Sequence, residues 1–404
     1  MPFRTNRRVL VTMCLATLVG QTTAENQSQQ QPTFSGRAEL VLVDVVVTDH
    51  KSQPIKGLTA ADFVVKEDGA VRPILAFEAI EGGRRATLTR EPAAAGSPPS
   101  AGTPEEASVA VLIDDQHLSP GQAAATQTAL RSTISLLSAR EATLMLVAPE
   151  SRISVAAQLP FGAGRMVAAT YNVRGKRVED RGSFPVADHE ALQIVDGDRR
   201  ALARVVSRFV ALNPDLSEGG ATMFARNRAT ETADAARRSN KATYGVALLC
   251  LDWLESRLGR RHLVIVSSGL ARDAAEDRYK SVIARSLQLN VPVHFVDART
   301  LAGAGRYQSL AYGVNLGRDA DEGSSARIDE SAGLVQLATD TGGLTVGGTN
   351  DLDESMQRLL ETMSAYYILA YQPPPKGAPG FRRIEVTTSR AGVLIRARRG
   401  YEAR

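Results

Sequence analysis

Several residue types that would point to a particular chemistry are scarce in this sequence. Of its 404 residues 5% are aromatic, two are cysteine and five are histidine. The histidines are scattered without zinc-ligand spacing, and no Gly-x-x-x-x-Gly-Lys-Ser/Thr loop for nucleotide phosphates occurs. The sequence therefore argues against a zinc enzyme and a nucleotide hydrolase. His262 and His294 fall in strand-like runs and are predicted to be structural.

Long apolar runs are lacking beyond the N-terminus, where none approaches the roughly 18–20 residues of a membrane-spanning helix. Val9–Gly20 is apolar but short. Three arginines precede it and Thr22-Thr23-Ala24 follows it, which is the pattern of an export signal. We predict that residues 1–24 are a cleaved signal peptide. The mature chain is then secreted or periplasmic, in the cell envelope, with no transmembrane span; a short membrane anchor or a buried helix is the alternative.

An excess of one charge is missing from the mature chain. The full sequence has 48 Lys and Arg against 44 Asp and Glu, but residues 1–24 contain three arginines and no acidic residue. Their removal leaves 45 basic against 44 acidic residues. This balance gives no electrostatic reason to expect a nucleic-acid partner. Cys250 is then the one remaining cysteine, so no intramolecular disulfide is predicted, and its apolar neighbours place it in the core.

What is present first is a β pattern. Residues 36–80 are predicted to form a small β module with three strands, and Glu67-Asp68-Gly69 is a turn of the hairpin type. The expected strands are 39–48, 63–66 and 74–77. Residues 81–106, which become rich in Pro, Gly, Ser and Ala, are predicted to be a linker.

Strands and helices then alternate through residues 107–365. This order predicts an α/β fold whose mostly parallel sheet is covered by helices on both faces. Residues 160–190 and 301–327 interrupt the pattern and are predicted to be an insertion and a surface loop. The expected strands are 108–113, 144–147, 153–156, 262–266 and 291–296, and the expected helices are 120–140, 199–212, 234–258 and 273–289.

The C-terminal residues 366–402 return to β. Strands are expected at 366–371, 381–386 and 393–397. Because a three-stranded piece is marginal alone, we predict that they pack with the N-terminal module.

Three blocks of sequence resemble the acidobacterial-type VWFA-related proteins, which carry a von Willebrand factor type A (VWA) domain. The resemblance covers roughly residues 37–402, and implies an exported protein with a Rossmann-like VWA domain flanked by β elements. The first block is Val43-Asp44-Val45-Val46-Val47-Thr48-Asp49, with Pro54-Ile55-Lys56-Gly57-Leu58-Thr59, Asp62-Phe63 and Glu67-Asp68-Gly69. The second is Leu112-Ile113-Asp114-Asp115. The third is Ala338-Thr339-Asp340-Thr341-Gly342-Gly343, with Asn350-Asp351-Leu352, Tyr366-Tyr367-Ile368-Leu369-Ala370-Tyr371-Gln372-Pro373 and Arg396-Ala397-Arg398-Arg399-Gly400-Tyr401.

The resemblance also implies a possible site for a divalent cation, the metal-ion-dependent adhesion site. Its pattern is Asp-x-Ser-x-Ser after the first strand, a Thr in a second loop and an Asp after the central strand. This chain departs from that pattern. Counted from Asp114 the serine positions hold Gln116 and Leu118, and counted from Asp115 they hold His117 and Ser119.

The other two positions are no better matched. Thr222 could supply the second-loop hydroxyl, but Ser268 stands where the second carboxylate belongs. We predict a degenerate site and no cofactor; a bound Mg²⁺ would have to use Asp114, Asp115, Ser119 and Thr222. Two alternatives are a softer metal site that includes His117, and a capping role for Asp115 and Ser119 at a helix beginning near Pro120.

For function, we predict a protein that is not an enzyme and that binds a protein partner in the cell envelope. Ligands of parallel sheets bind at the carboxyl ends of the strands. The candidate binding residues there are Asp114, Asp115, His117, Ser119, Thr222 and Ser268. One alternative is a hydrolase that uses the cleft around Asp114, Asp115, His117 and Ser268, although Ser267-Ser268-Gly269 only faintly matches a nucleophile elbow. Another is a structural subunit of a surface assembly.

Overall fold

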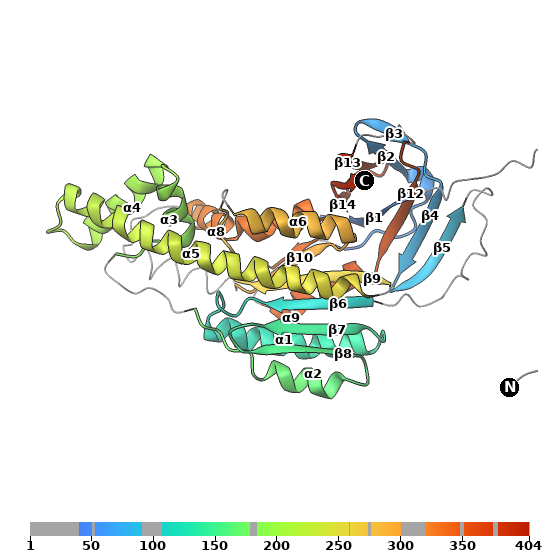
Figure 1. Ribbon diagram of the computed structural model, residues 1–404, viewed down its shortest axis with the longest axis horizontal. Helices are drawn as coiled ribbons and strands as arrows, with labels where there is room; N and C mark the ends of the chain where they lie inside the picture. The colour runs from blue at the N-terminus through green and yellow to red at the C-terminus, as the bar shows by residue number, and fades with distance from the viewer. Residues whose placement is uncertain are drawn as a thin grey trace, which may run out of the picture. The chain divides into compact units, whose positions relative to one another are not determined.

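Figure 1 shows the computed structural model of the chain. The structure describes residues 40–50, 53–90, 107–177, 184–257, 259–273, 276–299, 320–347, 351–374 and 379–403. The predicted signal peptide, residues 91–106 of the predicted linker and residues 301–319 of the predicted loop lie outside the described residues. Among the described helices, none combines the length and the apolarity that crossing a membrane requires.

A six-stranded sheet forms the centre of the α/β part, in the order β11-β10-β9-β6-β7-β8. Neighbouring strands are parallel except for β7 and β8, which are antiparallel. Residues 108–113 are all buried, as expected for a parallel strand covered on both faces. The strands are β6 (Ala107–Ile113), β7 (Thr143–Ala148), β8 (Ile153–Gln158), β9 (Arg260–Ser267), β10 (Val293–Asp297) and β11 (Thr345–Val346).

Helices cover both faces of this sheet, and alternate residues of β6 face opposite sides. Val109, Val111 and Ile113 pack with α1 (Pro120–Ser138), α2 (Ala163–Thr170) and α9 (Leu352–Met363). Ala110 and Leu112 pack with α5 (Glu218–Glu255), α6 (Asp277–Leu289) and α8 (Ala320–Asp340). The prediction of a mostly parallel sheet flanked by helices is thus confirmed, and the arrangement is compatible with a Rossmann-like fold.

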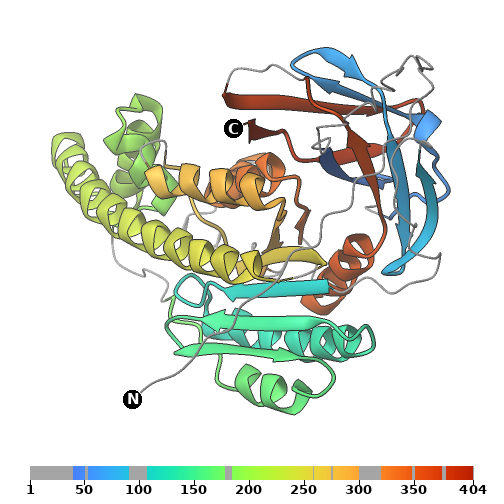
Figure 2. The same cartoon turned by 45° about the vertical axis from the view of Figure 1, so that its right-hand side comes forward.

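The N-terminal half of α5 continues beyond the sheet and packs with α3 (Asp188–Val195) and α4 (Arg199–Leu212), as Figures 1 and 2 both show. We call this unit the helical arm. It has its own apolar core, to which α5 contributes alanines at every fourth position: Ala221, Ala225, Ala229 and Ala233. Residues 218–233 were not predicted as helix, because Gly219-Gly220 reads as a loop. The structure instead places both glycines in the first turn of α5, after the N-cap Ser217.

The β module is made of two antiparallel sheets built from both ends of the chain. One has the order β14-β1-β12-β4-β5 and the other the order β15-β13-β2-β3. β12 lies between β1 and β4, so the predicted pairing of N-terminal with C-terminal strands is present. The strands are β1 (Val41–Thr48), β2 (Phe63–Glu67), β3 (Ala70–Arg72), β4 (Ala76–Glu81), β5 (Arg84–Arg90), β12 (Tyr366–Tyr371), β13 (Gly380–Thr388), β14 (Leu394–Ala397) and β15 (Gly400–Ala403), and a 3₁₀ helix covers Ala60–Asp62.

Two predicted boundaries are wrong. Residues 84–90 were assigned to the linker but form β5, an edge strand, where charged and polar residues are usual. Residues 320–327, assigned to a surface loop, are the beginning of α8. Residues 163–170, which lie within the predicted insertion, form α2, which packs on α1 and β8.

Candidate functional site

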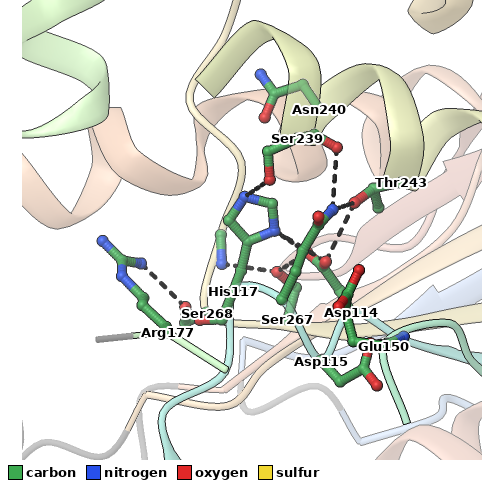
Figure 3. A network of polar contacts seen from close by, with 12 residues as sticks. Asp114, Asp115, His117, Glu150, Arg177, Ser239, Asn240, Thr243, Ser267 and Ser268 are labelled. Carbon is green, nitrogen blue, oxygen red and sulfur yellow. Dashed lines mark hydrogen bonds and ion pairs between the residues drawn. The ribbon is translucent and has the colours of Figure 1, made fainter. Parts of the chain in front are cut away.

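The polar residues that follow β6 form a tight turn over the carboxyl end of the sheet. The backbone N–H of Asp114 donates to Val266 of β9 at 2.9 Å, which continues the sheet by one residue. The N–H of His117 then donates to the carbonyl of Asp114 at 3.0 Å. This turn folds the His117 side chain back onto the Asp114 side chain (Figure 3).

The carboxylate of Asp114 is the centre of a buried network and is 2% exposed. It accepts hydrogen bonds from the hydroxyl of Ser267 at 2.6 Å and of Thr243 at 3.1 Å, so β9 and α5 both contact it. Nδ1 of His117 lies 2.8 Å from each carboxylate oxygen. Burial alone would raise the pKa of Asp114, but the adjacent His117 and these hydrogen bonds outweigh it and hold the pKa below its usual range.

His117 connects this carboxylate to α5. Since a carboxylate only accepts, Nδ1 carries a hydrogen and donates to Asp114. Nε2 lies 2.7 Å from the hydroxyl of Ser239, which is half-buried on α5. Gln116 strengthens the same junction, because its side-chain amide donates to the Ser239 carbonyl at 3.0 Å and to the Thr243 hydroxyl at 2.8 Å. The loop after β6 is therefore fixed to α5 at several points.

Three predicted site residues have supporting roles near this network. The hydroxyl of Ser268 donates to the carbonyl of His117 and accepts from Arg177 at 3.2 Å. Ser119 is the N-cap of α1, as the capping prediction had it. Asp115 is not a cap. Its side chain turns away and accepts from the backbone N–H groups of Glu150 and Ser151, and burial raises its pKa.

Thr222 does not join the others. It lies in the first turns of α5, where its hydroxyl donates to the carbonyl of Glu218 at 2.8 Å, and not in a loop. At 1.5 Å per residue it is roughly 30 Å along the helix from Thr243. The hydroxyl beside Asp114 is that of Thr243. Ser239 and Thr243 were both missed, although their spacing of four places them on one face of a predicted helix.

The side chains gathered here fit a divalent cation poorly. Mg²⁺ takes about six oxygen ligands and Ca²⁺ six to eight. Within the described part of this network Asp114 brings the carboxylate, and Asp115 faces away from it. The hydroxyls of Ser267 and Thr243 point their hydrogens at Asp114, and His117 covers both of its oxygens. Across the described ranges no group of three or more His, Cys, Asp and Glu side chains could hold a metal ion.

A scan against models of protein families finds no match for this chain, and a search of curated proteins finds none. The resemblance to VWFA-related proteins therefore stays a prediction that rests on the quoted motifs.

A cleft of about 240 Å³ lies at the opposite end of the sheet, between the α/β part and the β module. Its lining includes Arg140, Arg260 and Tyr366. Arg140 donates to the carbonyl of Leu360 at 3.2 Å. The guanidinium of Arg260 lies 3.2 Å from Asp44 and over the ring of Tyr366. Arg140 thus bonds within the α/β part, and Arg260 contacts the β module. The cleft therefore marks the junction between these two parts of the chain.

His262 and His294 lie side by side in β9 and β10. Nδ1 of His262 is 3.0 Å from Nε2 of His294, and the backbone N–H of Leu344 donates to the other nitrogen of His294. Burial lowers the pKa of both rings, that of His294 to about 3. Both are thus neutral core residues, which agrees with the structural role predicted for them. Cys250 is also buried, and burial raises the pKa of its thiol to about 12.

Proposed function

We propose that this chain is an exported VWA-like protein of the cell envelope that binds a protein partner without a divalent cation. The partner would bind at the carboxyl ends of β6 and β9, where residues 114–119 and 267–268 form a surface that we call the rim. The observation that carries this proposal is the network around Asp114, which ties the loop after β6 to β9 and α5. A loop held from several sides presents one fixed surface, and such preorganisation lowers the entropy cost of binding.

The residues that would contact the partner are the exposed ones around this network. Asp114, Asp115, His117 and Ser268 are buried and hold the shape of the rim. Glu150 and Lys176 lie beside them, form an ion pair at 3.4 Å and have side chains 46% and 55% exposed. Arg174 is exposed as well. Charged groups of this kind set partner choice and association rate more than affinity.

The proposal is tested by crosslinking with mass spectrometry on the mature protein in envelope extract. A double charge reversal, Arg174→Glu with Lys176→Glu, is compared with wild type and with the control Lys280→Glu. Lys280 also forms an exposed ion pair, with Asp277, but it lies on α6. We expect a specific partner that wild type and control both recover and that the double variant loses. Equal recovery by all three, or no specific partner, contradicts the proposal.

A second candidate function is acyl hydrolysis, which one observation favours. Asp114, His117 and Ser239 have the contacts of a catalytic triad, with Nδ1 of the histidine on the carboxylate and Nε2 on the hydroxyl. Ser268, the serine suggested by the sequence, is not at Nε2. Against this candidate, Ser239 lies in the middle of α5, where backbone N–H groups are used within the helix and not for an oxyanion.

A fluorophosphonate probe separates the two candidates. A hydrolase is labelled on Ser239, and the label is lost in His117→Ala and Ser239→Ala. If the chain is instead a binding protein, the probe labels neither wild type nor either variant. The remaining alternative, a structural subunit of an assembly, predicts that light scattering on the mature chain shows a mass that rises with protein concentration.

A further inference from the structure

Asp114 stands at a candidate first position of the cation-site pattern that the resemblance implies, yet an imidazole lies against its carboxylate. Nδ1 of His117 is at 2.8 Å from both carboxylate oxygens, so it lies on the face that a chelated ion would use. A cation bound there would sit about 2.0–2.6 Å from the same oxygens. The imidazole and such a cation therefore exclude each other.

The other oxygens near Asp114 are committed in the same way. Ser267 donates to one carboxylate oxygen at 2.6 Å and Thr243 donates to the other at 3.1 Å. A hydroxyl that ligates a cation must instead turn its lone pair toward the ion. With His117 in place, the hydrogen bonds to Asp114 come from three sides and satisfy a buried carboxylate without a metal.

His117 is itself held in this position from three directions. Its backbone N–H bonds to Asp114, its carbonyl accepts from Ser268, and its Nε2 contacts Ser239. The residue is 6% exposed. Moving the ring aside to admit an ion would break the contact with Asp114 and the contact with Ser239 together.

We infer that the His117 side chain is a built-in replacement for the cation, which locks the rim in one metal-independent state. This inference deepens the proposed function and rests on it for its biological meaning. Its test, however, reads cation binding and stability in the purified mature chain, so partner binding can fail while this inference stands, and the reverse.

The test removes the ring and asks whether a cation takes its place. In His117→Gly the buried Asp114 carboxylate loses its imidazole partner and keeps the hydroxyls of Ser267 and Thr243, and we expect the Tm to fall by about 5 °C or more. Mn²⁺ at about 10 mM should recover at least about 2 °C, reversed by chelator. His117→Asp adds a second carboxylate at this place and should gain a larger Mn²⁺ response. Wild type should respond to neither Mn²⁺ nor chelator.

Two controls make the response specific. Asp114→Asn combined with His117→Gly removes the carboxylate, and should abolish the Mn²⁺ response and be more stable than His117→Gly alone. His189→Gly removes another buried histidine, on α3, and should give no Mn²⁺ response. If His117→Gly fails to fold, the Mn²⁺ response of His117→Asp decides whether a cation can replace the ring. The double variant then remains the control that lacks the carboxylate. A wild-type Tm raised by Mn²⁺, or the lack of a Mn²⁺ response in both His117→Gly and His117→Asp, overturns the inference.

Discussion

Single residues in the rim network keep a buried charge inside the protein. Asp114 remains ionised because three donors face it, although burial works against its charge. Asp115, its neighbour in sequence, accepts two backbone N–H groups and has a raised pKa. The two carboxylates therefore differ in what their loss costs.

Asp114→Asn is expected to destabilise the protein by about 2–3 kcal/mol, because the amide places N–H groups against donors. Asp115→Asn keeps an acceptor for its backbone partners and should cost about 1 kcal/mol. The comparison is made by urea unfolding. Since the pKa of Asp114 is lowered from 3.8, its contribution is complete above that pH and declines as the pH falls through the lower folded value. Equal losses in both variants would contradict the role given to Asp114.

The two core histidines predict how stability depends on pH. Their pKa values lie below 6.5 in the fold, so the unfolded chain takes up protons first and stability is lost as the pH falls below 6.5. Each ring contributes up to about 1.4 kcal/mol per pH unit. Between pH 6.5 and 5, His294→Gln should lower the pH dependence of the free energy of unfolding by the contribution of one proton, about 1.4 kcal/mol per pH unit. Urea unfolding at a series of pH values measures this dependence. If the free energy of unfolding depends on pH equally in the variant and in wild type, His294 does not make this contribution.

At the scale of elements, the sequence predicted the strands of the central sheet better than it predicted the site. Continuous apolar runs such as 108–113 and 262–266 identify buried strands, and the chain order places Asp114 and Ser268 at the same edge. It could not show that Ser239 and Thr243 face that edge, because this depends on how α5 is rotated against the sheet. Thr222 was chosen instead because Gly219-Gly220 reads as a loop, although the cap at Ser217 overrides both glycines.

The helical arm gives a prediction at this scale. Ala229 on α5 is fully buried in the core of the helical arm. Ala229→Leu should overpack this core and lower the free energy of unfolding by about 1–3 kcal/mol. Because this core is separate from those beside the sheet, hydrogen exchange should become faster in α3 and α4 and stay unchanged in β6 and β9. Asn227→Leu, on the exposed side of the same helix, is the control. A uniform acceleration across all strands would mean that the arm is not an independent unit.

At the scale of the whole described chain, the N-terminal strands β1–β5 and the C-terminal strands β12–β15 build one β module. The α/β part comes between these two groups of strands in the sequence. β12 enters the module directly after α9, so the chain itself joins the two parts. Arg260, at the beginning of β9, adds a side-chain connection, through an ion pair with Asp44 of β1 at 3.2 Å and through the ring of Tyr366. The guanidinium is nearly buried, so its loss leaves the largely buried Asp44 carboxylate without this ion-pair partner.

Arg260→Ala is therefore expected to cost about 3 kcal/mol. Arg285→Ala is the control, because Arg285 also forms ion pairs, with Asp252 and Glu255, but the side chains of these partners are more than half exposed. Exposed pairs contribute about 0–1 kcal/mol each, so the control should lose little. In calorimetry, Arg260→Ala should broaden or split the unfolding transition, because the β module and the α/β part lose a shared contact. A single sharp transition and equal losses in both variants would mean that Arg260 does not couple the two parts.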